Sequence, residues 1–185
     1  MKYANNNLLL EKWKKGQTGF PMVDASMRCL IKNGWLNFRM RAMLVSFLCH
    51  FLEQDWRRGV YHLAKLFLDY EPGIHFTQFQ MQAGVTGINS IRVYNPIKQS
   101  IEKDPDAVFL KKWIPELACI DNAFIHQPWK LTEIDLIDKS IPEFYKHPII
   151  SHKLGRTEAV KELWSLRKNE IVKKESKRIL KTHVR

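Results

Sequence analysis

Gly34-Trp35-Leu36-Asn37-Phe38-Arg39-Met40-Arg41 opens the most informative part of the chain, which continues to residue 82. The next residues, 42–52, are apolar on nearly every helical face, a pattern typical of a buried helix rather than a surface helix. Arg39 and Arg41 head this helix. Because a buried arginine needs a partner, the pattern predicts one for these side chains in the folded chain.

Apolar residues recur with a helical period along most of the chain. Helices are expected over residues 8–13, 21–33, 38–54 and 77–83, from Asp55 to the Pro72-Gly73 pair, and from Pro105 to about Trp113. Residues 115–153 are interrupted by prolines and should form short helices with irregular connections. Only residues 91–94 hint at extended structure. The sequence therefore predicts an all-α fold, and 185 residues with 45% hydrophobic content predict one domain over 1–185.

Composition narrows the class of protein further. No stretch has the roughly 20 uncharged apolar residues that a membrane span needs, and the first residues lack the apolar region of a signal peptide. The three cysteines, Cys29, Cys49 and Cys119, form no C-x-x-C pair, so no metal site is expected. Cys29 and Cys49 fall in apolar helical runs and are interpreted as core residues. Reduced thiols and the absence of a membrane segment predict a cytoplasmic protein.

The net charge of +11 is unevenly distributed. Residues 153–185 contribute +7, and we expect them to form a basic C-terminal helix whose last turns fray. A basic balance suits a polyanionic partner such as DNA. A lysine-rich terminal helix is, however, more often only solvated, so the tail by itself is weak support for DNA binding.

Several short motifs follow one another in a set order. They are Gly19-Phe20-Pro21-Met22-Val23-Asp24-Ala25-Ser26-Met27-Arg28, Gly34-Trp35, Arg39-Met40-Arg41, Trp56-Arg57-Arg58-Gly59, Arg92-Val93-Tyr94-Asn95-Pro96, Trp113-Ile114-Pro115-Glu116-Leu117 and Ile125-His126-Gln127-Pro128-Trp129. Together, over roughly residues 10–160, they resemble the C-terminal, FAD-binding half of the DNA photolyase and cryptochrome family. Each motif alone is weak, but their shared order is hard to explain by chance.

The resemblance implies a multi-helix bundle that holds a U-shaped FAD beside a positively charged groove. It also implies a light-driven carbon–carbon lyase, in which the excited reduced flavin donates an electron to a pyrimidine dimer flipped out of DNA. Family members carry an antenna domain and further flavin-domain helices that this sequence does not contain. We therefore expect a partial FAD-binding domain that is inactive alone and whose retention of FAD is an open question.

Five residues correspond to positions around the flavin: Phe38, Arg41, Asp69, Glu71 and His75. Arg41 and Asp69 match an ion pair against the isoalloxazine ring that can tune the flavin's potential; a salt bridge that only joins two helices is the alternative. Phe38 and Glu71 are departures, because the family commonly has Asn and Asp there. His75 aligns with the position facing flavin N5, where a histidine can exchange a proton near neutral pH, or it is incidental after a Pro-Gly turn.

Trp35, Trp56 and His75 are the candidate catalytic residues. Trp35 and Trp56 match positions that relay electrons from the surface toward the flavin, although from the residues alone both would be core aromatics. The third relay position, nearest the flavin, is Phe79, and phenylalanine is far harder to oxidise than tryptophan. The relay is therefore interrupted unless another aromatic residue substitutes: Trp113, Tyr61 or Tyr70.

The resemblance also predicts contacts with DNA that contains pyrimidine dimers. Basic positions near the lesion phosphates, where binding is salt-sensitive, correspond to Arg39, Arg92 and Lys98. Gln80 and Gln82 are expected to reach base edges. Met81 stands where many photolyases stack a tryptophan on the lesion, and a methionine keeps a polarizable apolar contact there. Taken singly, each charged residue is more often a solvated surface charge.

Two other functions stay open at this point. A cryptochrome-like blue-light receptor would bind FAD without repair and signal through a partner, and the residues at 75, 79 and 81 favour it. A non-catalytic helical module would use its basic surface to bind DNA or another partner. Self-association is also expected, because the absent half of the domain would leave an apolar face exposed.

Overall fold

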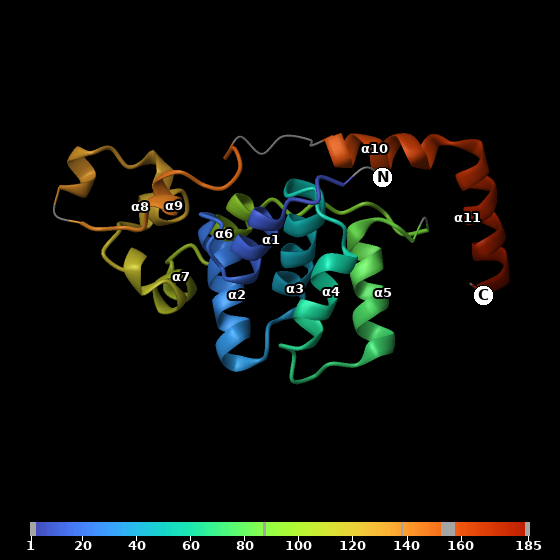
Figure 1. The fold of residues 1–185 in the computed structure, drawn as a ribbon, viewed down its shortest axis with the longest axis horizontal. Coiled ribbons are helices and arrows are strands. Elements are labelled where there is room, and N and C mark those ends of the chain that lie inside the picture. The colour runs from blue at the N-terminus through green and yellow to red at the C-terminus, as the bar shows by residue number, and fades with distance from the viewer. Residues whose placement is uncertain (1–2, 87, 138, 153–157, 184–185) are drawn as a thin grey trace.

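The computed structural model describes residues 3–86, 88–137, 139–152 and 158–183 (Figure 1). Within these ranges the regular structure is helical and contains no strand, so the predicted all-α fold is confirmed. A π-helical turn, Phe47–Phe51, follows α3, and short 3-10 turns lie between α7 and α9. The α-helices are α1 (Asn7–Lys14), α2 (Pro21–Asn33), α3 (Phe38–Ser46), α4 (Arg57–Ala64), α5 (Pro72–Ala83), α6 (Pro96–Lys103), α7 (Val108–Trp113), α8 (Asn122–Ile125), α9 (Glu143–Lys146), α10 (Glu158–Lys168) and α11 (Glu170–His183).

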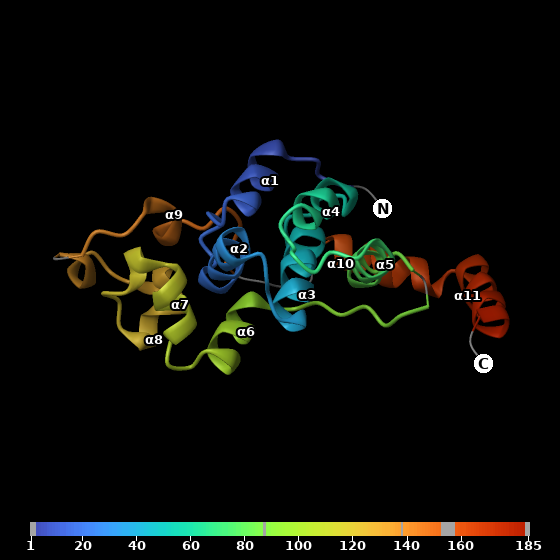
Figure 2. The same cartoon turned by 90° about the horizontal axis from the view of Figure 1, so that it is seen from below.

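The core forms where α2 and α3 pack against each other. α1, α6 and α7 contact α2, whereas α5 contacts α3 and α4, as the two views show (Figures 1 and 2). Residues 42–52 are all buried, which confirms the buried helical segment expected there. Cys29 and Cys49 are buried as predicted, and Cys119 is exposed.

Two helix boundaries around this core differ from the prediction. The segment expected to be one α-helix over 38–54 leaves regular α-geometry after Ser46 and continues as the π-helical turn. The Pro72-Gly73 pair does not end a helix; it begins α5, five residues before the expected start. The reason is local: proline lacks an N–H that the first turn could not pair anyway, and the Glu71 carboxylate accepts the N–H groups of Gly73 and Ile74.

The helix expected from Pro105 begins three residues later, at Val108. Asp104 still caps it, because its carboxylate oxygens accept the N–H groups of Phe109 (3.0 Å) and Leu110 (2.9 Å). The expected capping residue is therefore correct, and only the position of the first helical residue was wrong.

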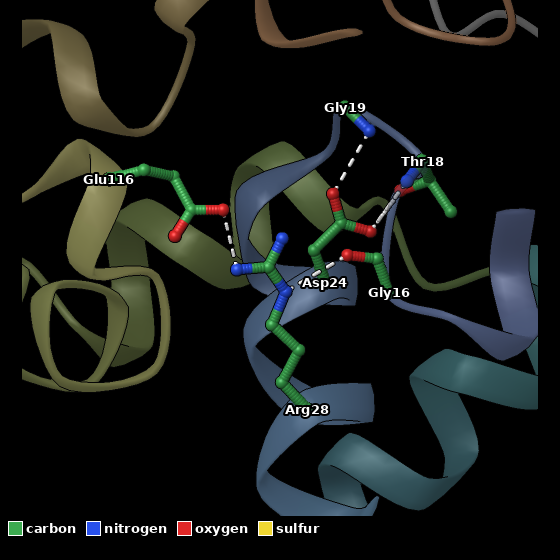
Figure 3. A network of polar contacts seen from close by, with 6 residues as sticks. All are labelled: Gly16, Thr18, Gly19, Asp24, Arg28 and Glu116. Atoms are coloured by element: carbon green, nitrogen blue, oxygen red, sulfur yellow. Dashed lines mark hydrogen bonds and ion pairs between the residues drawn. The ribbon is translucent and has the colours of Figure 1, made fainter. Parts of the chain in front are cut away.

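Asp24 fixes the loop that precedes α2 (Figure 3). Its buried carboxylate accepts three hydrogen bonds, from the Thr18 N–H (2.8 Å), the Thr18 hydroxyl (2.7 Å) and the Gly19 N–H (2.9 Å). Gly19 has φ +83°, and a Cβ there would lie 2.1 Å from the backbone oxygen of Phe144. Only glycine fits this turn, which brings α9 and the residues just after it against the start of α2.

Arg28, one turn beyond Asp24, joins α2 to the segment that follows α7 (Figure 3). Its Nε donates to the carbonyl oxygen of Gly16 (3.1 Å), and its Nη1 donates to Glu116 Oε1 (2.6 Å). The half-buried guanidinium is thereby paired on both sides, as a partly buried charge requires.

The basic C-terminal segment forms two helices in place of the one expected. α10 and α11 meet at Asn169, whose side-chain oxygen accepts the Ile171 N–H and so begins a new helix. α11 is helical to His183, and the fraying expected in the last turns stays a prediction. Residues 153–157 of the expected helix lie outside the described ranges. None of the helices within these ranges has the length and apolar composition required to cross a membrane.

Candidate functional site

A solvent-open pocket of about 100 Å³ lies between α3, α4 and α5. Its walls are mostly apolar, with Val45, Leu63 and Phe79 among them, and a few polar side chains converge on it. Every residue predicted to surround a flavin lines this pocket: Phe38, Arg41, Asp69, Glu71 and His75. A concave apolar site with few convergent polar groups is typical of small-molecule binding sites.

Arg41 is held from three directions at the edge of the pocket. Its Nε donates to the carbonyl oxygen of Leu36 (2.7 Å), and its Nη2 donates to Asp69 Oδ2 (2.8 Å). The guanidinium also lies over the Phe67 ring, 4.1 Å from its centroid. The hydrogen bond from Arg41 lowers the pKa of Asp69, so the pair is fully charged at neutral pH. The partner predicted for Arg41 is present, and Arg39 has a weaker one, since its Nη1 lies 3.4 Å from Gln99 Oε1.

His75 sits deeper, on the first turns of α5. Its Nε2 lies 2.9 Å from the carbonyl oxygen of Val60, which can only accept, so Nε2 carries the proton and Nδ1 is the free acceptor. Burial lowers the pKa of His75, so the ring is neutral at pH 7. Four aromatic rings pack around it: Phe67, Tyr70, Phe76 and Phe79.

Phe38 and Glu71 flank the pocket in different ways. Phe38 is the first residue of α3 and is exposed at the mouth. The carboxylate of Glu71 caps α5, so its oxygens are already occupied by two backbone N–H groups. Glu71 therefore has a structural role that is independent of any ligand.

The candidate relay residues do not form one connected path. Trp56 lies 6.5 Å from Phe79, ring centroid to ring centroid, and Phe79 lies 5.2 Å from His75, so this branch reaches the pocket. Trp35 is 56% exposed in the connection between α2 and α3 and does not line the pocket.

Three aromatic residues are the candidate substitutes for the tryptophan missing at position 79. Tyr70 lines the pocket and packs edge-on to His75 (5.3 Å), and Tyr61 packs edge-on to Phe76 (5.6 Å). Trp113 lies on α7, which packs on α2 on the side away from α5 (Figure 1). Only the two tyrosines are near the pocket.

The predicted DNA contacts divide into exposed and engaged residues. Arg39, Arg92 and Lys98 are exposed, and Lys98 pairs loosely with Glu102 at 3.6 Å. Met81 lines the pocket, and Gln80 is half-buried on the same helix. The expectation that Gln82 reaches base edges is wrong. Gln82 is 5% exposed, and its Nε2 donates to the carbonyl oxygen of Arg92 (2.7 Å) because α5 packs against this segment.

Sequence reasoning missed Ser46 altogether. The Ser46 hydroxyl, buried near the end of α3, accepts the N–H of Tyr94 (2.9 Å) and lies 3.1 Å from His50 Nδ1. Together with Gln82 it holds the backbone on both sides of Val93. The available signal was a single hydroxyl inside the run 42–52, which is otherwise apolar except for His50.

Comparison with known proteins identifies the family of the chain. Residues 1–165 match the family model described as "FAD binding domain of DNA photolyase". The chain belongs to this family. The deoxyribodipyrimidine photo-lyase of Alkalihalophilus pseudofirmus is 36% identical over 155 residues, and the cryptochrome DASH of Gloeobacter violaceus is 37% identical over 126 residues.

Solved structures of photolyases and cryptochromes have the same fold. A cryptochrome from Synechocystis aligns with a TM-score of 0.78 at 30% identity and covers 89% of this chain. A class III photolyase from Agrobacterium tumefaciens aligns with a TM-score of 0.78 at 28% identity and covers 94%. The matched part is 34% and 36% of those two chains, respectively.

This member of the photolyase family spans about a third of the length of its curated relatives. The match covers 82% of the chain but 32% of the Alkalihalophilus photo-lyase, and 68% of the chain but 25% of the Gloeobacter cryptochrome DASH. The pocket described above thus corresponds to one portion of the FAD-binding domain in those larger proteins.

Proposed function

We propose that this chain is the C-terminal part of the FAD-binding domain of a light-driven lyase that splits pyrimidine dimers in DNA, and that residues 1–185 form one partial domain. The observation that carries the proposal is the convergence of the Arg41–Asp69 ion pair and His75 on one apolar pocket. When bound, FAD supplies the light-driven electron transfer, and the protein supplies binding, orientation and electrostatics.

Arg41 and His75 have separate tasks in this proposal. Arg41, held by the Leu36 carbonyl and Asp69, presents a fixed positive charge to the pocket and stabilises negative charge on a bound ring. His75 keeps its proton on Nε2, toward Val60, which leaves Nδ1 able to accept a hydrogen bond or a proton. The mostly apolar walls strengthen both effects once a bound ring covers the open side of the pocket.

The pocket fits only part of FAD. Its volume of about 100 Å³ is below the range of roughly 300–1,000 Å³ that is usual for ligand sites. The charge and apolar character suit one side of the flavin ring, and we infer that other parts of the complete FAD site come from segments that the longer relatives contain.

Arg39, Arg92 and Lys98 are the proposed contacts to the phosphates of damaged DNA. All three are exposed, and Arg92 and Lys98 flank the turn that begins α6. Met81, on the wall of the pocket, is the proposed apolar contact to the flipped lesion, with Gln80 beside it. Trp56 remains the candidate electron donor, with Phe79 as a packing contact rather than a redox relay, whereas Trp35 would have to act from the surface.

FAD retention by the purified chain tests the flavin site. Visible absorption is recorded before and after the chain is mixed with excess FAD and desalted. We expect the unmodified chain and the Arg39→Met control to retain flavin equally, since Arg39 lies outside the pocket, and Arg41→Met to lose it. Loss of flavin from both variants, or from neither, would contradict the assignment of Arg41, and no retention by the unmodified chain would show that this portion alone is not a flavin site.

A cryptochrome-like light receptor is the second candidate. Phe79, which stands in the branch from Trp56 to His75, favours it, as does the similarity to proteins named cryptochromes. Repair of dimer-containing DNA under blue light by the flavin-loaded protein separates the two candidates. Bound, photoreducible flavin without repair would exclude the lyase.

Self-association follows from an apolar face beside the pocket. Trp35 is exposed next to Gly34, whose carbonyl oxygen accepts the N–H of Leu68 (2.9 Å), and Leu68 is 84% exposed. Phe38 and Ile74 extend this surface. We propose that it is covered by a second copy of the chain or by further flavin-domain helices, and a purely monomeric sedimentation profile would refute self-association.

A further inference from the structure

α11 lies beyond the part of the chain that matches the family model, which ends at residue 165. Both views show it extending from α10 away from the body (Figures 1 and 2). The connection between α5 and α6, described over 84–86 and 88–95, runs from α6 toward α11 in both views. Arg92, one proposed phosphate contact, belongs to this connection, and Lys98, another, belongs to α6, from which the connection runs toward α11.

α10 fixes the start of α11 near the connection that carries Arg92. Val160 and Leu163 are 3% and 4% exposed, and α10 packs on the π-helical turn. Gly84, at the start of the connection that carries Arg92, is so close to α10 that a Cβ there would lie 3.2 Å from Leu163 Cδ1. The base of α11 is thus tied by packing to the connection rather than joined to it only through the chain.

The basic side chains of α11 are not equivalent. Two of them are neutralised within the helix, since Lys173 pairs with Glu170 (2.7 Å) and Arg178 pairs with Glu175 (2.6 Å). Lys174, Lys177 and Lys181 are exposed, and across the described parts of the chain none of them is in an ion pair.

The spacing of these three lysines gives α11 one charged face. They recur at i, i+3 and i+7, which places them together, opposite the half-buried Val172 and Ile179. At about 1.5 Å per residue, Lys174 and Lys181 are roughly 10 Å apart along the helix axis. That distance is close to three successive steps between phosphates on one strand of DNA, at about 3.4 Å of axial rise per step.

We propose that α11 is a second DNA-contacting surface, in which Lys174, Lys177 and Lys181 neutralise phosphates of the duplex beyond the lesion. The proposal rests on the proposed function, because it takes DNA as the partner. It differs from the lesion contacts in two respects: it concerns undamaged flanking duplex, and it involves no base reading. Contacts of this kind add affinity and salt dependence but no sequence preference.

The test measures binding to an undamaged 30-base-pair duplex by fluorescence anisotropy across a salt series. The variant is the full chain with Lys174→Gln, Lys177→Gln and Lys181→Gln, because glutamine keeps helix propensity close to that of lysine. We expect the slope of log affinity against log salt to become shallower by about 2 to 3, at about 0.9 per phosphate, and affinity near 100 mM salt to fall at least ~tenfold.

A matched control removes the same charge elsewhere. It carries three substitutions on and just after α1 and at the end of α4: Lys12→Gln, Lys15→Gln and Lys65→Gln. In Figure 2, α1 and α4 lie at the edge opposite α11. We expect the slope of log affinity against log salt to fall in this control by no more than half as much as it falls in the α11 variant. Equal losses in both triple variants would indicate only bulk charge and would overturn the proposal, as would unchanged binding by the α11 variant.

The remaining outcomes separate α11 from the lesion site. Loss of preference for dimer-containing over undamaged duplex in the unmodified chain, with the α11 effect intact, would count against the proposed repair function alone. Absence of all duplex binding would overturn the α11 proposal, and the blue-light repair assay would then test the proposed function separately.

The α11 surface also has exposed apolar side chains, Ile171 and Leu180, so binding to vesicles that contain phosphatidylglycerol is measured as well. If the three lysines are needed for binding to vesicles and the chain does not bind DNA, the partner of α11 is an anionic membrane surface and the DNA proposal is overturned.

Discussion

The side-chain amide of Gln82 donates a 2.7 Å hydrogen bond to the carbonyl oxygen of Arg92. Two residues further on, the N–H of Tyr94 donates to the Ser46 hydroxyl (2.9 Å). A segment without regular secondary structure is thus fixed to α5 and α3 through its backbone, and the exposed side chain of Arg92 is presented at a set distance from the pocket.

Gln82→Leu is expected to destabilise the chain by about 1–2 kcal/mol, because it leaves the partly buried carbonyl oxygen of Arg92 without its hydrogen bond. Urea denaturation measures this change. Gln80→Leu, on the same helix but without that hydrogen bond, should stay within about 0.5 kcal/mol of the unmodified chain. If Gln82 acts on DNA through Arg92, the affinity losses of Gln82→Leu and Arg92→Ala will not add in the double variant, whereas full additivity would contradict this role.

Asp24 is expected to make stability depend on pH between about 4 and 6. Burial raises the pKa of Asp24 to about 6, above a value of about 3.9 in the unfolded chain, so the folded chain binds this proton more tightly. The free energy of unfolding should therefore rise as pH falls from about 6 to about 4, by up to ~3 kcal/mol. Denaturation at several pH values measures the effect.

Asp24→Asn should lose this pH-dependent component, and it should also be less stable at pH 7, because the amide cannot accept all three hydrogen bonds. Asp121→Asn is the control, since Asp121 only caps α8 at the surface. Parallel stability curves for the unmodified chain and Asp24→Asn would disprove the role of this carboxyl group.

The Arg41–Asp69 ion pair should affect stability with the opposite sign. The hydrogen bond from Arg41 lowers the pKa of Asp69, so its contribution is present above the unfolded value of about 3.9 and is lost as pH falls through the lower folded value. Because the side chain of Asp69 is 50% exposed, solvent screening limits the contribution to below about 1 kcal/mol. Asp69→Asn should therefore be slightly less stable at pH 7 and equal to the unmodified chain near pH 2. High salt should shrink the difference at pH 7, and a difference that persists at low pH would point to lost packing instead.

Gly19→Ala is expected to cost more than about 2 kcal/mol. The new Cβ would lie 2.1 Å from the Phe144 carbonyl oxygen, and the φ of +83° is strained for alanine. Gly73→Ala is the control, because φ there is not positive and the nearest atoms, 3.2 Å away, belong to the carboxylate of Glu71. Thermal denaturation compares the two variants, and equal melting temperatures would contradict the close approach of the Phe144 backbone to Gly19.

Much of the architecture follows from local pattern. The run 42–52 is polar only at Ser46 and His50, so nearly every helical face of it is apolar, which predicts burial, and the segment is buried throughout. Gly34 ends α2 with φ +69°, as expected of a glycine after an apolar helix. The family motifs led to Arg41 and Asp69, which form an ion pair across 28 positions of the chain.

Other features depend on residues that meet only in the folded chain. A glutamine on α5 could face DNA bases or the protein interior, and only the approach of the Arg92 segment makes Gln82 an internal donor. Pro72-Gly73 can end one helix or begin the next, and the Glu71 cap selects the second. Periodicity records how each residue partitions between water and the core, so it predicts helices and their buried faces. It does not record which groups are brought together by packing. The hydrogen bond from Gln82 positions the Arg92 segment, and the apolar contact of α10 beside Gly84 positions α11.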